Sequence, residues 1–396
     1  MNYKSLAILC ATVLSSSLCM AQTGSSAVVE DFQKTATTQE GKEYPQVNSE
    51  RRVRVSLSAP QANKVQLDID AKKIDLVKNE KGVWIGESGP QDEGFHYYQL
   101  NVDGASVPDP GSLYYYGASR WGSGIEIPAK DQAFYALENV PHGTLCETYY
   151  FSKTSNSNRH VYIYLPPGYD KNISVKYPVL YLQHGMGENE TGWGAQGRTN
   201  LIMDNLIAKG KVKPFIIVME NSSMTMGARG PRPAAGTPAP AGAAPAARPA
   251  GGGMNFSGQF ERILLDDLIP YIESNFRVIP NQANRAMAGL SMGGMQTHSI
   301  VVANPDKFSY VGMFSSGTFV PTEFTDATVL ASVKKNIKLV FMSFGGREGG
   351  SARIADAAAE WNKVGIKGVS YISPETAHEW QSWRRSLYEF APLLFK

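Results

Sequence analysis

Short apolar runs alternate with helix-like segments from about residue 145 to the end of this chain. The runs occur in YPVLYLQHG, PFIIVMENSS, RAMAGLS, YVGMFSSG, IKLVFMSFGG and GVSYISPE. The segment 259–276 places its apolar residues on one helical face, namely Phe260, Ile263, Leu264, Leu268 and Ile272. Buried strands separated by amphipathic helices are typical of a mostly parallel sheet with helices on both faces. The sequence therefore predicts an α/β domain for residues 145–396.

Residues 22–135 have a different pattern. Alternating runs, such as VRVSL at 53–57 and VQLDI at 65–69, are broken by Pro, Gly, Asn and Asp. This pattern predicts a small antiparallel β-sandwich with a flexible start, in which Trp84 and most of the tyrosines fill the core.

The segment 226–254 is almost wholly Ala, Pro and Gly. Such a composition buries too little apolar surface to offset the entropy of ordering the chain, so we expect a disordered loop. The strand and helix pattern resumes after it, which makes it an insertion within the α/β domain. Because it follows a strand, we expect it near the face where open α/β sheets place their ligands.

The first 21 residues have the pattern of a secretory signal peptide. Lys4 supplies the positive charge, residues 6–18 form the apolar core, and Cys19-Met20-Ala21 is a cleavage site of the small-x-small type. The alternatives are a membrane anchor, which the serines interrupt, and a lipoprotein attached at Cys19 or Cys10. We expect cleavage after Ala21 and a secreted or periplasmic protein without a membrane span.

Composition narrows the classes of partner. The formal net charge is +2 over 396 residues, and no block of lysine or arginine occurs, so we expect no nucleic-acid partner and a neutral or small ligand. The mature chain keeps only Cys146, and therefore has no internal disulfide. No metal-ligand cluster surrounds this cysteine, and we expect neither a metal nor an organic cofactor.

Ser291 lies in AGLSMGGMQT, between a predicted strand and a predicted helix. Glycines occupy the second position on either side of it, at 289 and 293. A nucleophile elbow needs this arrangement, because the turn is tight and larger side chains would collide with backbone. The element order and this motif together predict an α/β-hydrolase with Ser291 as its nucleophile.

A serine nucleophile needs a general base, which comes last in the chain in this fold. His378, in PETAHEWQSW, is the one histidine after the elbow helix, and it follows a predicted strand. His298 is a weaker candidate because it lies within the elbow helix. We therefore predict that His378 is the base, which must be neutral to act, so that activity falls as acid protonates it.

The acid of such a triad is expected between the serine and the histidine, on the loop after the penultimate strand. Glu348, in KLVFMSFGGREGG, meets this requirement. Asp356 is the alternative, although it lies in a predicted surface helix. For the oxyanion hole, we expect the backbone N–H of Met292 and that of Met186, in LYLQHGMGENETGW. His184, in the same loop, is expected to have a structural role.

Two resemblances add to this interpretation. Residues 82–110 resemble the early-set immunoglobulin-like modules of carbohydrate-binding module family 48 in their Gly-Val-Trp, Gly-Phe-His-Tyr-Tyr, Val-Asp-Gly and Asp-Pro motifs. The chain from 145 to 396 resembles the esterase D family and, within it, carbohydrate esterase family 1. The matching motifs are LPPGY at 165–169, YPVLYL at 177–182, His184-Gly185, NRAMAGLSMGG at 284–294 and the terminal pattern of His378, Trp380, Trp383 and Arg384. The family's acid is usually aspartate, where this chain has Glu348.

The resemblance implies a serine carboxylic-ester hydrolase that acts on esters of plant cell-wall polysaccharide or oligosaccharide. Release of ferulate from arabinoxylan is the expected activity. An acetyl xylan esterase, an enterochelin-type siderophore esterase and a non-catalytic carbohydrate-binding protein are the alternatives. A planar phenolic acyl group needs aromatic contacts, for which Trp193, Trp380 and Trp121 are candidates.

Overall fold

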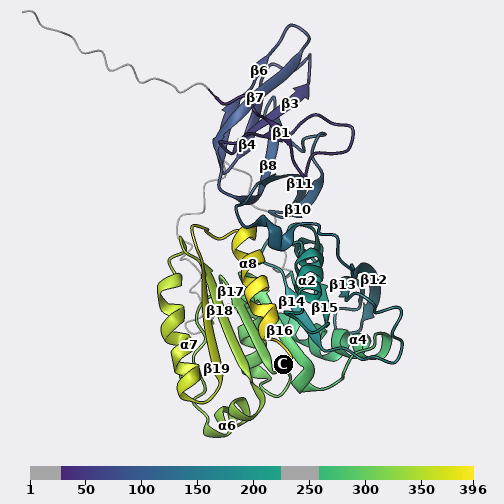
Figure 1. Ribbon diagram of the computed structural model, residues 1–396, viewed down its shortest axis with the longest axis vertical. Helices are drawn as coiled ribbons and strands as arrows, with labels where there is room; N and C mark the ends of the chain where they lie inside the picture. The colour runs from purple at the N-terminus through teal and green to yellow at the C-terminus, as the bar shows by residue number, and fades with distance from the viewer. Residues whose placement is uncertain (1–27, 224–257) are drawn as a thin grey trace, which may run out of the picture.

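The computed structural model describes residues 28–223 and 258–396, and shows two parts joined into one body (Figure 1). A β-sandwich built from the first third of the chain lies at one end of a larger α/β domain. The expected signal peptide, 1–21, and the expected loop, 226–254, lie outside the described residues. None of the described helices is both long enough and apolar enough to span a membrane.

The sandwich consists of two sheets whose strands pair in antiparallel fashion. One sheet has the order β1 (Gln33–Lys34), β2 (Gln46–Val47), β3 (Arg52–Ser58), β7 (Val83–Pro90) and β6 (Val77–Lys78). The other has the order β10 (Tyr114–Gly117), β11 (Arg120–Ile127), β8 (Gly94–Val102), β4 (Val65–Ile69) and β5 (Lys72–Asp75), with β9 (Ala105–Val107) paired to β8. Alternate residues of β4 are buried, as the pattern at 65–69 predicts. Trp84 is buried in the core of the sandwich, and its Nε1 donates to Ala59 O.

The α/β domain is built on an eight-stranded sheet. Its order is β12 (Thr144–Ser152), β13 (Ser157–Leu165), β15 (Ile216–Glu220), β14 (Val179–Gln183), β16 (Arg285–Leu290), β17 (Tyr310–Phe314), β18 (Leu339–Gly345) and β19 (Lys367–Ser373). The strands from β15 to β19 in this order run parallel, while β12 and β13 form an antiparallel edge. The predicted mostly parallel sheet is therefore confirmed.

Helices cover both faces of this sheet, as predicted. In β14, Val179 and Tyr181 belong to one core cluster, whereas Leu180 and Leu182 belong to the other. The first face carries α3 (Gly258–Arg262), α4 (Ile269–Asn275), α5 (Met292–Ala303), α6 (Ala327–Asn336) and α7 (Ile354–Lys363). The second face carries α1 (Gly192–Ala195), α2 (Thr199–Ala208) and α8 (Trp380–Phe390).

The predicted helix at 259–276 differs from the structure in one respect. Its five expected apolar residues are all buried on the first face. However, a π-helical turn, Ile263–Leu268, separates α3 from α4, and Pro270 occupies the first turn of α4. Proline has no backbone N–H, so the regular α-helical hydrogen-bond pattern cannot run through this point.

The sandwich and the α/β domain share a hydrophobic core. Phe95, Tyr115 and Phe134 pack in the same cluster as residues of α2 and α8. At this junction, both guanidinium nitrogens Nη1 and Nη2 of Arg384 donate to the carboxylate of Glu126, over 2.7 and 3.0 Å. Burial raises the pKa of the Glu126 carboxylate, but the charge of Arg384 and its hydrogen bonds lower it, and this pKa lies below its usual value. A buried charge that loses its partner is costly, so the pair favours a fixed arrangement of the two parts.

Candidate active site

Ser291 lies at the sharp turn between β16 and α5. Its backbone has φ 51° and ψ −117°, a strained conformation for a residue with a side chain. Its N–H donates to Phe314 O over 2.8 Å, which ties the turn to the neighbouring strand β17. A Cβ atom at Gly289 would lie 2.4 Å from the carbonyl carbon of Gly293, and one at Gly293 would lie 2.5 Å from His184 O. The glycines are therefore required for this turn.

The structure brings Ser291, His378 and Glu348 into one hydrogen-bonded chain. Ser291 Oγ donates to His378 Nε2 over 2.9 Å, and His378 Nδ1 donates to Glu348 Oε2 over 2.7 Å. His378 lies on the loop between β19 and α8, and its ring packs edge-on against Trp383, with 5.2 Å between ring centroids. An ionised carboxylate can only accept hydrogen bonds, so Nδ1 carries the proton and Nε2 is free to accept one from the serine.

Glu348 is held on the loop after β18 by two further donors. Ser315 Oγ donates to its Oε1 over 2.6 Å, and the N–H of Gly345 donates to the same oxygen over 2.7 Å. Burial alone would raise the pKa of Glu348, but the hydrogen bonds from His378, Ser315 and Gly345 lower it below its usual value. The group therefore stays ionised, as the partner of a histidine base must.

Asp356, the alternative acid, and His298, the alternative base, lie away from this chain of hydrogen bonds. Asp356 is exposed in the first turn of α7, a surface helix. His298 lies on α5, where its Nε2 bonds to Glu323 Oε2 over 2.6 Å and its ring packs edge-on against Phe319. Neither side chain touches the chain of hydrogen bonds at Ser291.

The expected oxyanion residues occupy the two loops beside the serine. Met292 begins α5, where the first N–H groups of a helix have no intrahelical acceptor. Met186 lies on the loop after β14 and is 64% exposed. The preceding carbonyl, Gly185 O, accepts from His184 Nδ1 over 2.8 Å and from the N–H of Glu188 over 3.2 Å.

His184 has the structural role that the sequence predicts. Its Nε2 accepts from the N–H of Ser222 over 3.0 Å, so its proton is on Nδ1, which donates to Gly185 O. The imidazole is fully buried, and burial lowers its pKa, so it remains neutral. It therefore anchors the loop and is not available as a base.

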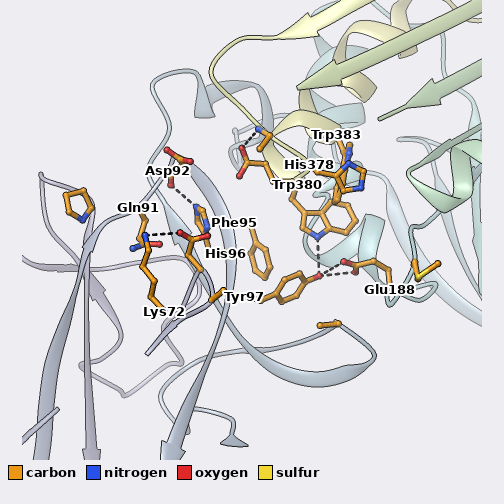
Figure 2. A pocket seen from close by; sticks show the side chains of 17 residues that line it. Lys72, Gln91, Asp92, Phe95, His96, Tyr97, Glu188, His378, Trp380 and Trp383 are labelled. Carbon is orange, nitrogen blue, oxygen red and sulfur yellow. Dashed lines mark hydrogen bonds and ion pairs between the residues drawn. The ribbon is translucent and has the colours of Figure 1, made fainter. Parts of the chain in front are cut away.

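A cavity of about 780 Å³ opens between the sandwich and the α/β domain, beside His378 (Figure 2). We call it the interdomain cavity. It is lined on the α/β side by Met186, Glu188, Ala377, His378, Glu379, Trp380 and Trp383, and on the sandwich side by Asp70, Ala71, Lys72, Pro90, Gln91, Asp92, Phe95, His96, Tyr97 and Ala118. No signal in the sequence predicts that the sandwich residues line a cavity, although Phe95, His96 and Tyr97 belong to the Gly-Phe-His-Tyr-Tyr motif of the sandwich.

The three expected substrate-binding tryptophans have different positions. Trp380 lines the interdomain cavity, and its Nε1 points at Tyr97 (Figure 2). The expectation for Trp193 is wrong, because Trp193 is not part of the cavity lining and its Nε1 donates to Gln183 O, inside the core. Trp121 is 56% exposed on β11, packs against Tyr116 and is not part of the cavity lining.

Glu188 is a buried carboxylate at the junction of the two parts. Tyr97 OH, from β8, donates to it, at 2.8 Å from Oε1 and 2.9 Å from Oε2. Burial raises the pKa of Glu188 from 4.5 to about 7. The folded protein therefore holds this proton more tightly than the unfolded chain does, and the stability that this contributes is present at low pH and lost as the pH rises through about 7.

We expect the substitution Glu188→Gln to become relatively more stabilising as the pH rises from about 5 to about 8. Wild type must ionise a buried carboxylate over this interval, whereas the amide stays neutral. At about 1.4 kcal/mol per pKa unit, the difference in the free energy of unfolding should shift by about 2–3 kcal/mol in favour of the variant. Urea unfolding of both proteins at several pH values measures it. A difference that does not change with pH would contradict the burial of this charge.

Among residues 28–223 and 258–396, no three His, Cys, Asp or Glu side chains are grouped so that they could hold a metal ion. Cys146 is half-buried on β12, and its Sγ lies 3.4 Å from Ile163 O as a weak donor.

The groups gathered at Ser291 are a hydroxyl, an imidazole and a carboxylate in sequence, next to backbone N–H groups and a cavity. Such a set can transfer an acyl group through a serine.

The fold and this site define an α/β-hydrolase. The chain belongs to the esterase family, whose model, described as "Putative esterase", matches residues 152–393. It is 41% identical over 379 residues to an endo-1,4-beta-xylanase/feruloyl esterase of Xylanibacter ruminicola, an alignment that covers 93% of this chain and 48% of that protein. It is 26% identical over 166 residues to endo-1,4-beta-xylanase Y of Acetivibrio thermocellus, covering 39% of this chain and 13% of that protein. This chain thus spans about half, or less, of the length of these relatives.

Solved structures share the fold. A ferulic acid esterase of Anaeromyces mucronatus superimposes with a TM-score of 0.51 at 22% identity, covering 67% of this chain and 96% of that one. The enterobactin esterase of Shigella flexneri superimposes with a TM-score of 0.58 at 14% identity, covering 86% of this chain and 92% of that one. At these identities the likeness concerns the fold.

Proposed function

We propose that this protein is a serine esterase that releases ferulate from the arabinoxylan of plant cell walls. The observation that carries the proposal is the continuous hydrogen-bonded chain from Ser291 through His378 to Glu348, at the edge of the interdomain cavity. The 41% identical relative, named as a xylanase and feruloyl esterase, supports this substrate class.

The geometry supports acyl transfer in two steps. Ser291 Oγ attacks the ester carbonyl while His378 Nε2 takes its proton, and the negative oxygen is stabilised by the N–H groups of Met292 and Met186. The imidazolium then gives the proton to the departing sugar alcohol. In the second step a water molecule, deprotonated by His378, attacks the acyl-enzyme and releases the acid.

The cavity lining favours an uncharged substrate with an aromatic acyl group. The rings of Phe95, Tyr97 and Trp380 lie along it (Figure 2), and aromatic rings pack well against a planar phenolic group. Carboxylates outnumber lysines in the lining even without the buried Glu188, with Asp70, Asp92 and Glu379 against Lys72. This negative charge disfavours an anionic iron chelate. We therefore favour a feruloyl esterase over a siderophore esterase, although the enterobactin esterase has the same fold.

A substrate panel on the purified protein tests the proposal. We expect kcat/KM for methyl ferulate to exceed that for a short aliphatic ester by at least about tenfold, because an aromatic acyl group buries more apolar surface in the cavity. Preferred release of acetate from acetylated xylan would favour an acetyl xylan esterase, and preferred cleavage of enterobactin would favour a siderophore esterase. A protein that hydrolyses no ester and does not react with a fluorophosphonate at Ser291 would be a binding protein.

We also propose that the protein is exported. The signal-peptide pattern of residues 1–21 supports this, and export agrees with the proposed substrate, which lies outside the cell. Sequencing the N-terminus of the protein recovered from the periplasm or the medium tests it, with a mature chain that starts after Ala21 as the expected result. A full-length chain in the cytoplasm would contradict export.

A further inference from the structure

We propose that the β-sandwich holds the oxyanion loop, residues 185–188, in its catalytic conformation, so that Tyr97 and Ser119 are positioning residues for ester hydrolysis. This inference rests on the proposed esterase function. It assigns to the sandwich a role in the reaction itself, in addition to forming one wall of the cavity. Two contacts carry it, one from the turn between β10 and β11 and one from strand β8.

The first contact joins two backbones. The N–H of Ser119, in the turn between β10 and β11, donates to Gly187 O over 2.8 Å. Ala118 and Ser119 both have positive φ, 50° and 62°, as the two central residues of a tight β-hairpin turn do. Gly187 has φ +78°, and a Cβ atom there would lie 3.3 Å from Ser119 N. The turn and the loop therefore fit closely at a residue next to Met186.

The second contact joins Tyr97 to the side chain of Glu188, the last residue of the loop. Besides donating to Glu188, Tyr97 OH accepts from Gln196 Nε2 over 2.6 Å and from Trp380 Nε1 over 3.1 Å. A phenol has one proton and two lone pairs, so this buried hydroxyl is fully used. Its proton is directed at the Glu188 carboxylate because its lone pairs already have donors.

These contacts act on the oxyanion N–H through one peptide group. The carbonyl of Gly185 and the N–H of Met186 belong to the same trans peptide and point in opposite directions. Whatever holds the carbonyl therefore aims the N–H. Two donors hold it, His184 Nδ1 and the N–H of Glu188. Tyr97 fixes Glu188, and Ser119 fixes the peptide between Gly187 and Glu188, so the sandwich contributes to holding the second donor in place.

The test compares two substitutions on adjacent residues of β8. Tyr97→Phe removes the hydroxyl that holds Glu188. Tyr98→Phe is the matched control, because Tyr98 OH also donates to a buried carboxylate, Asp109 Oδ2, over 2.7 Å, but does so inside the sandwich. Each protein is assayed on 4-nitrophenyl acetate and methyl ferulate, and its folding is checked by urea unfolding.

We expect Tyr97→Phe to lower kcat on both esters by the same factor, about tenfold, with KM nearly unchanged. This is part of the 10²- to 10³-fold that is typically lost with a whole oxyanion donor. Tyr98→Phe should keep the wild-type kcat and lose only stability. A Tyr97→Phe protein with wild-type kcat on the acetate, or with a defect confined to the ferulate, would overturn the proposal and make Tyr97 an acyl-binding residue.

A second pair of variants decides the matter if Tyr97→Phe does not fold. Glu188→Gln retains an oxygen that can accept from Tyr97, whereas Glu188→Ala does not. We expect kcat on the acetate to fall further in Glu188→Ala than in Glu188→Gln, and equal values would overturn the proposal. Wild-type protein that is inactive on every ester would overturn the esterase function and this inference together, while an active wild type with unaffected variants would overturn this inference alone.

Discussion

Ser291→Ala should lower kcat on a small aryl ester by about 10⁴- to 10⁶-fold and leave the protein folded. The substitution removes the attacking oxygen, and the remaining N–H donors and binding contacts supply only residual catalysis. Ser291 Oγ bonds to His378 alone within the described structure, so its loss should leave no other polar group unpaired. Steady-state hydrolysis of 4-nitrophenyl acetate measures the effect.

Two controls accompany this measurement. Ser299→Ala, two turns further along α5, should keep wild-type activity, because Ser299 lies away from the triad and the cavity. A fluorophosphonate should label wild type and the Ser299→Ala variant, and should leave Ser291→Ala unlabelled. Substantial turnover by Ser291→Ala would exclude the serine mechanism, even if the protein proved to be an esterase.

The parts of this site that the sequence predicts have local signals. The glycines around Ser291 and the flanking strand and helix pattern lie within about twenty residues of one another. His378 and Glu348 follow predicted strands, and the carboxyl ends of parallel strands meet at one edge of a sheet. Periodicity and chain order are therefore enough to bring these three residues together.

No local sequence signal predicts which residues of the sandwich lie beside the active site. Tyr97 and Glu188 are 91 residues apart, and Tyr97 and Trp380 are 283 residues apart, in parts of the chain with different folds. Strand alternation predicts that Tyr97 and Tyr98 face opposite sides of β8, but it does not predict which side meets the esterase domain. The docking of the two parts depends on a shared core that only the folded chain defines.

The error at Trp193 has a related cause. A tryptophan near a catalytic loop suits an aromatic slot and a hydrophobic core equally well from its sequence. In the structure, Trp193 packs edge-on against Trp380, with 5.5 Å between ring centroids, and only Trp380 reaches the cavity. Both rings are buried, with Trp193 1% and Trp380 2% exposed, so burial does not distinguish them; the difference is that Trp380 belongs to the cavity lining and Trp193 does not.

Glu348→Gln should lower kcat by about 10³- to 10⁴-fold, because the amide imposes the wrong tautomer on His378. Glu348 Oε1 accepts from both Ser315 Oγ and the N–H of Gly345. The carbonyl oxygen of a glutamine would take this place, since an NH₂ group cannot accept. Its NH₂ would then face His378 Nδ1 and donate to it, leaving the imidazole proton on Nε2, where it blocks transfer from Ser291.

Asp356→Asn is the matched control for this substitution, since it makes the same change at the alternative acid. It should keep wild-type kcat, because Asp356 is exposed on α7. Glu348→Asp distinguishes the requirement for a negative charge from the requirement for the length of the side chain. It keeps the carboxylate but shortens the side chain by one methylene, so its kcat should lie between those of wild type and Glu348→Gln. The reverse result, with Asp356→Asn inactive and Glu348→Gln active, would assign the acid to Asp356 and contradict the observed hydrogen-bonded chain.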